Sequence, residues 1–94
     1  MTLKELNVGW CKSSVAEDVY QFYFTCPICG PGYQVCVHVH AKEPINYIWN
    51  INPLPKLESE LYTVTLTPSI QNIRHGRKLC PGHFNVIGGE VHNA

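Results

Sequence analysis

Two short turns, far apart in the sequence, constrain the fold of this chain more than any other feature. The first turn places Cys26 and Cys29 on either side of Pro-Ile, and the second places Cys80 and His83 on either side of Pro-Gly. Each turn offers two soft metal ligands three positions apart, and its proline or glycine favours a tight bend. Together the turns supply the four ligands that a closed tetrahedral zinc site needs. The sequence therefore predicts one structural Zn²⁺ shared by a first knuckle (residues 26–30) and a second knuckle (residues 80–83).

Alternatives exist for the fourth ligand and for the chemistry of the first knuckle. Cys36 and His75 are rival fourth ligands, but a strand leaving the first knuckle would carry Cys36 away from the metal, and we expect His83. A redox dithiol normally opens a helix, whereas a strand pattern follows Cys29. A rubredoxin-like iron site uses four thiolates, so a histidine in the fourth position favours zinc.

The length and the cysteine usage agree with a metal site. The chain has 94 residues and five cysteines, an odd number. A chain of this length forms one domain (residues 1–94) with a modest core, and small domains often add a metal or disulfides. The N-terminus lacks the apolar core of a secretion signal, and no apolar run is long enough to cross a membrane. We therefore expect a reducing cytoplasm and a metal site; a disulfide-bonded secreted domain is the competing interpretation.

Alternating apolar and polar residues predict a mainly-β fold. The segment 19–25 is rich in aromatic residues with high strand propensity, and 60–67 alternates most cleanly, with Tyr62, Val64 and Leu66 on its apolar face. The predicted strands cover residues 6–10, 19–25, 33–40, 46–52, 60–67 and 84–87, with a short return around Val91. The expected fold is a small, zinc-ribbon-like antiparallel sheet extended by extra strands, in which the two knuckles share one zinc.

Two further groups of residues are candidates for an interaction surface. Cys36, His38 and His40 lie at every second position and therefore share one face of the predicted strand 33–40. This face is expected to be solvated or to meet a partner, although a second metal site or a zinc hydrolase using His38 and His40 is an alternative. The other group is the basic cluster Arg74, Arg77 and Lys78, which would contact phosphate or an acidic protein surface if it is not simply solvated. Cys11 is expected to be a small buried residue.

The chain resembles an uncharacterised family of small zinc-knuckle proteins from phages and bacteria, a domain of unknown function that is sometimes mislabelled "ammonia monooxygenase". The matching parts lie between residues 20 and 91, and the C-terminal ones are the most specific. They are Phe22–Gly30, Trp49, Thr65–Ile70, Cys80-Pro81-Gly82-His83-Phe84 and Gly89-Glu90-Val91. The resemblance implies a zinc site at Cys26, Cys29, Cys80 and His83, and it implies no established activity. Some relatives are encoded beside ubiquitin-like conjugation genes, which points to protein interaction.

The expected function is a zinc-stabilised, non-enzymatic interaction module, encoded by a phage and binding a host protein. A site filled by four protein ligands leaves no open position for water or substrate, so the zinc is expected to be structural. The alternative is a nucleic-acid-binding zinc ribbon that uses the basic cluster. The formal net charge of +0 argues against strong, sequence-independent binding to nucleic acid.

Overall fold

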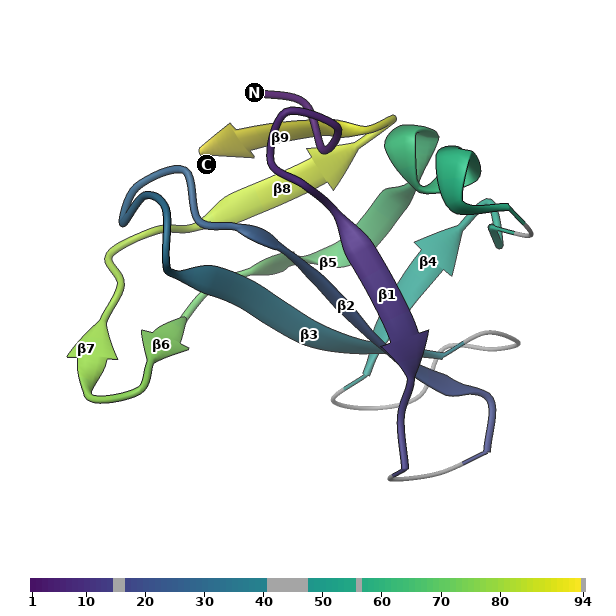
Figure 1. Ribbon diagram of the computed structural model, residues 1–94, viewed down its shortest axis with the longest axis horizontal. Coiled ribbons are helices and arrows are strands. Elements are labelled where there is room, and N and C mark those ends of the chain that lie inside the picture. Colours follow the sequence, from purple (N-terminus) through teal and green to yellow (C-terminus); the bar gives the residue numbers. More distant parts are fainter. Residues whose placement is uncertain (15–16, 41–47, 56, 94) are drawn as a thin grey trace.

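A single seven-stranded sheet, with strand order β1-β2-β3-β4-β5-β8-β9, forms most of the protein. A computed structural model describes residues 1–14, 17–40, 48–55 and 57–93 (Figure 1). Strands β6 and β7 form a separate hairpin, and a 3₁₀ helix, η1, precedes β5. The bounds are β1 Gly9–Lys12, β2 Val19–Thr25, β3 Gln34–His40, β4 Trp49–Asn52, η1 Glu58–Thr63, β5 Thr65–Ile70, β6 Arg74–His75, β7 Lys78–Leu79, β8 Phe84–Ile87 and β9 Glu90–Asn93. The predicted small, mainly-β class is confirmed.

The core lies inside the curl of this sheet. β1, β2 and β3 pass in front of β5 and β8 (Figure 1), and the apolar faces of the two halves meet. Phe22 and Phe24 of β2 are fully buried, and the ring of Phe24 meets the ring of Phe84 in β8 edge to face, with 6.4 Å between centroids. The valines at alternate positions of β3 are also buried. Phe22 and Phe24 of β2 and the valines of β3 thus occupy alternate positions, as expected of strands with one face on the core.

The segment 60–67 differs from its predicted strand. Residues Glu58–Thr63 form η1, and the strand begins only at Thr65 and continues through Pro68 to Ile70. Leu61 is fully buried in the core, whereas Tyr62 is 37% exposed. In a 3₁₀ turn, the side chains that share a face are three positions apart, so Leu61 and Val64 both reach the core. The alternation of residues 60–67 was thus not a strand signal in its first half.

The N-terminal segment also differs from its predicted strand, because β1 begins at Gly9 rather than Leu6. Residues before it form turns, in which the Thr2 hydroxyl accepts a hydrogen bond from the Glu5 amide and the Glu5 carboxylate accepts one from the Thr2 amide. This reciprocal pair is the geometry of a capping box. Leu3 and Leu6 of the same turns are buried in the core. The segment therefore closes one end of the core.

The sheet is antiparallel, as predicted, except that β3 and β4 run parallel within the described residues. β3 pairs with β2 along its full length, but it pairs with β4 only through Val39 and His40. The earlier part of β3 has no strand on that side within the described residues. Of the predicted strand 46–52, residues 46 and 47 lie outside the described part. Among the described residues, no helix combines the length and apolar character needed to cross a membrane.

Candidate metal centre

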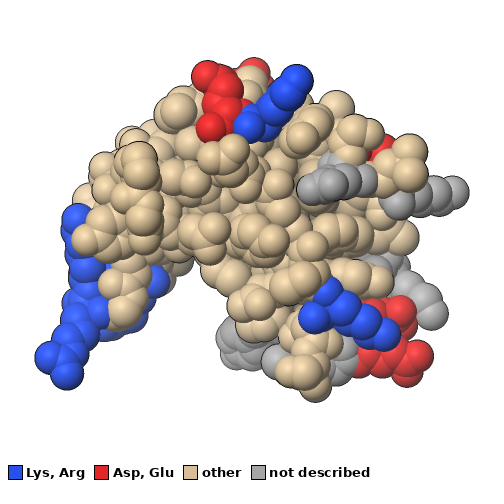
Figure 2. Space-filling view, in the orientation of Figure 1, with Lys and Arg blue, Asp and Glu red and all other residues tan. Residues whose placement is uncertain are grey.

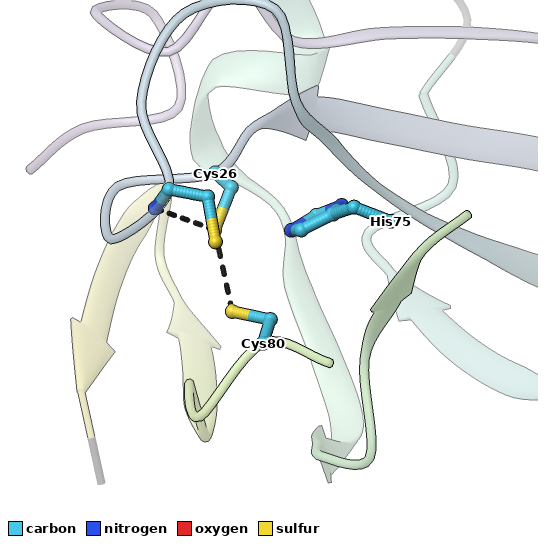
Figure 3. Close-up of side chains that lie close together, drawn as sticks. Cys26, His75 and Cys80 are labelled. Atoms are coloured by element: carbon cyan, nitrogen blue, oxygen red, sulfur yellow. Dashed lines mark hydrogen bonds between the residues drawn. The ribbon is translucent and has the colours of Figure 1, made fainter. Parts of the chain in front are cut away.

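Four side chains from both halves of the chain converge on one point. The ligand atoms of Cys26, Cys29, His75 and Cys80 all lie within 4.8 Å of one another. Figure 3 shows Cys26, His75 and Cys80 directed toward a common centre from different segments. The Sγ atoms of Cys26 and Cys80 are 3.6 Å apart. Two sulfurs bound to tetrahedral zinc at about 2.3 Å would lie about 3.8 Å apart, so this spacing suits a shared metal.

The first knuckle is built as the sequence predicts. β2 delivers Cys26 into the turn, and the Cys26 amide donates a hydrogen bond to the Tyr33 carbonyl, which starts the ladder to β3. The turn closes when the Gly30 amide donates to the Cys26 carbonyl at 2.9 Å, with Gly30 at a φ of 85° that suits glycine. The Cys29 amide points at Cys26 Sγ, 3.4 Å away. This contact holds the backbone of the turn close to the Cys26 sulfur.

The second knuckle supplies Cys80 through a similar turn. The Gly82 amide donates to Cys80 Sγ at 3.3 Å. A Cβ at position 82 would lie 2.5 Å from Cζ of Phe84 and 3.2 Å from Cys80 Sγ, so the turn packs too tightly for any larger residue. Cys80 itself is buried, and its amide donates to the Ile73 carbonyl at 2.9 Å. This last bond fixes Cys80 at the base of the β6–β7 hairpin.

His75 takes the position that the sequence analysis assigned to His83. His83 directly follows the turn residue Gly82 but lies outside the cluster, and its Nε2 is 2.8 Å from the Ser69 hydroxyl. His75 reaches the cysteines because β6 and β7 form a tight hairpin, with Arg74 opposite Leu79 and His75 opposite Lys78. The Cys-x-x-His spacing of the second knuckle thus marks a turn, but among the described residues His75, and not His83, lies with the three cysteines. The candidate ligand set is therefore Cys26, Cys29, His75 and Cys80, with His75 in place of the predicted His83.

The state of the His75 ring supports a metal. Its Nε2 is buried and has no hydrogen-bond partner within the described part of the chain. A buried polar atom without a partner costs about 1–3 kcal/mol, and most such atoms are paired in native proteins. The ring also packs against Tyr33, with centroids 5.3 Å apart. A ligated metal would satisfy the imidazole, and three thiolates with one imidazole form a set that suits zinc.

The pKa values of the Cys29 and Cys80 thiols are shifted in opposite directions, although both thiols belong to the same cluster. Burial raises the pKa of Cys29 to about 11, with hydrogen bonds to Cys80 and Cys26 adding to the effect. Burial would also raise the pKa of Cys80, but the Gly82 amide and the neighbouring thiols outweigh it, so that this pKa falls below its ordinary value. The Cys80 thiol therefore loses its proton more readily than the Cys29 thiol. A bound cation would stabilise all three thiolates.

The other predicted residues lie elsewhere. Cys36 is exposed on β3, His38 is half-buried and His40 is buried, so they do not form one solvated face. No second metal cluster occurs among the residues that the structure describes, and the one found contains none of these three. Arg74, Arg77 and Lys78 are all exposed on the β6–β7 hairpin. Cys11 is exposed, contrary to the expectation that it is buried.

No protein-family model, curated protein or solved structure matches this chain. The candidate metal centre is consequently supported by its own geometry and chemistry. Three sulfurs lie with one imidazole whose Nε2 has no hydrogen-bond partner among the described residues, and the four groups are close enough together to hold a single ion.

Proposed function

We propose that this protein is a zinc-stabilised interaction module that binds another protein. The observation that carries the proposal is the Cys₃His cluster, which joins the β2–β3 knuckle to the β6–β7 hairpin. With four protein ligands, a zinc ion there would have no open position for water or substrate, so its role is structural and not catalytic. The working surface then lies outside the metal centre.

The size and charge of the chain support a role in recognition. A small domain gains stability from a bound metal and can then present short strands and loops in fixed positions. Basic residues gather on the β6–β7 hairpin, at one end of the molecule in Figure 2, while acidic residues lie on other parts of the visible surface. Such segregated charge favours an acidic partner.

Affinity capture tests the proposal directly. The resemblance to phage and bacterial proteins makes a bacterial lysate the first source to search. Immobilised zinc-loaded protein should retain a specific protein after nuclease treatment, and the purified pair should bind again at micromolar or lower concentration. A Cys80→Ser variant, which lacks the metal centre, serves as control. Failure to retain any protein that the control does not also retain would refute the proposal.

A nucleic-acid-binding module is the second candidate, because the exposed Arg74, Arg77 and Lys78 are adjacent on one hairpin. This alternative predicts binding to oligonucleotides that weakens steeply as salt rises. Absence of binding to single- or double-stranded DNA and RNA at low salt would eliminate it.

A further inference from the structure

A groove runs along the side of β3 that faces away from β2. It forms a cavity of about 240 Å³, with Gln34, Cys36 and His38 on the β3 side and Gln71, Asn72 and Arg74 on the other. Trp49, the first residue of β4, lines it at the point where β3 gains its parallel neighbour. We call this feature the β3 groove. It brings part of the predicted Cys36/His38 surface next to the basic cluster, two features that are far apart in the sequence.

The backbone N–H and C=O groups of alternate β3 residues are directed toward this groove. The Cys26 amide bonds to the Tyr33 carbonyl, which makes residues 26 and 33 a hydrogen-bonded pair. Hydrogen-bonded pairs alternate with non-bonded pairs along an antiparallel ladder, so residues 34, 36 and 38 direct their N–H and C=O groups away from β2. The Thr25 amide agrees with this alternation of bonded and non-bonded pairs. It donates to the Leu6 carbonyl, on the side of β2 opposite β3, and therefore does not bond to Gln34. On the other side of residues 34–38, no strand pairs with β3 in the described part of the chain.

The charge around the groove has one sign. No Asp or Glu occurs among the described residues that line it, and Arg74 is exposed on its wall. Arg77 and Lys78 extend the cationic surface along the same hairpin, and Lys78 Nζ lies 4.8 Å above the ring of Tyr33, the residue that precedes β3. In Figure 2 the cationic hairpin borders a hollow in the surface. An occupant of this groove is therefore selected for negative charge.

We propose that the β3 groove binds an extended, acidic peptide segment of a partner protein as an added strand on β3. This inference rests on the proposed function, because it names the surface and partner chemistry of the interaction module. The backbone groups of residues 34, 36 and 38 supply main-chain hydrogen bonds, and the hairpin cations select acidic side chains. The metal centre holds the groove together, since the first knuckle leads into β3 while His75 and Cys80 anchor the hairpin wall.

The test uses a displayed library of random dodecapeptides, selected on the zinc-loaded full chain. Selected peptides should be enriched in Asp and Glu among strand-forming residues. Their amide shifts on binding should concentrate at Gln34, Cys36 and His38 in a ¹⁵N spectrum of the protein. Methylating alternate backbone nitrogens of the peptide on one edge should abolish binding, because that edge then has no donors for β3.

Two variants address the two walls separately. Arg74→Glu should weaken binding by roughly tenfold or more, whereas Lys12→Glu, the same charge change at an exposed position of β1, should have little effect. Cys36→Pro removes one outward N–H of β3 without breaking a bond to β2, and it should also weaken binding while zinc content stays unchanged.

The result that overturns the inference is a library that yields no enriched acidic peptide, or peptides that bind the Arg74→Glu and Cys36→Pro variants as tightly as the native protein. Displacement of the peptides by an oligonucleotide that binds more tightly would overturn it as well. These failures are distinguishable from failure of the proposed function. If a captured protein partner still binds both variants, the module stands and only the groove is wrong.

Discussion

His75 and Cys80 lie on the two sides of one short hairpin, and both direct a ligand atom to the same point. The pairing of Arg74 with Leu79 and of His75 with Lys78 sets this arrangement, and the bond from the Cys80 amide to the Ile73 carbonyl closes its base. The hairpin thus supplies two of the four candidate metal ligands. The first knuckle supplies the other two, Cys26 and Cys29.

The first prediction concerns loss of a cysteine ligand. Cys26→Ser should release zinc and abolish the cooperative fold, because the binding free energy of a structural zinc site is folding free energy, about 10–16 kcal/mol in small zinc-binding peptides at neutral pH. Metal analysis and the dispersion of the amide NMR spectrum would show both effects. Cys11→Ser, at an exposed cysteine outside the cluster, is the matched control and should keep zinc and fold. A Cys26→Ser protein with native dispersion would argue against a structural role.

Proton release on zinc binding gives the second prediction. With a pKa raised to about 11, the Cys29 thiol of the metal-free protein is protonated at neutral pH, and it must lose that proton to bind zinc. Zinc affinity should therefore fall as the pH is lowered. Calorimetric titrations in buffers of different ionisation enthalpy would count the protons, and Cys29→Ser should release one fewer than the native chain. Equal proton release from the two proteins would contradict this assignment.

The tight turn of the second knuckle leads to the third prediction. Gly82→Ala should destabilise the fold by about 1–3 kcal/mol, because the new methyl group would overlap the Phe84 ring and press on Cys80 Sγ. Gly76→Ala is a suitable comparison, since a Cβ there meets nothing within 4 Å. The only expected loss of stability comes from placing alanine at the positive φ of 64°. Its cost should be about 1 kcal/mol. Denaturant titrations with zinc present would rank the two; a larger loss at Gly76 would contradict the packing described here.

The fourth prediction separates η1 from the strand that the sequence pattern favours. Leu61→Ala should cost about 2–5 kcal/mol, because Leu61 is fully buried. Tyr62→Ala should cost far less, because this side chain is partly exposed and packs at the surface, where Lys4 Nζ lies 5.7 Å from its ring. A strand with Tyr62 on its core face would give the opposite order. Urea unfolding of the two variants distinguishes the arrangements.

The strands that could be predicted from the sequence are those whose alternation is long and whose buried face is aromatic or β-branched. β2 and β3 satisfy this condition, and the turn residues around Cys26 and Cys29 mark the knuckle between them. Residues 60–63 also alternate, but a short pattern of this kind does not separate a strand from a 3₁₀ turn, and burial of Leu61 against the core decides between them.

The candidate fourth ligand could not be predicted from sequence spacing, for a different reason. His83 has the expected spacing from Cys80, but spacing measures distance along the chain, and the ring is directed to Ser69. His75 is five positions before Cys80, a separation that has no metal-binding signature unless the intervening residues fold into a hairpin. The turn at Gly76, with a φ of 64°, makes that hairpin. A glycine within a basic run was the available signal, and it became informative only with the pairing of β6 and β7 known.

The most direct test of this account is the zinc content of His75→Ala and His83→Ala, measured by mass spectrometry on protein dialysed against a competing chelator. We expect one zinc per chain in the native protein and in His83→Ala, and loss of zinc from His75→Ala at chelator concentrations that the other two withstand. Retention of zinc by His75→Ala together with its loss from His83→Ala would contradict the metal centre described here.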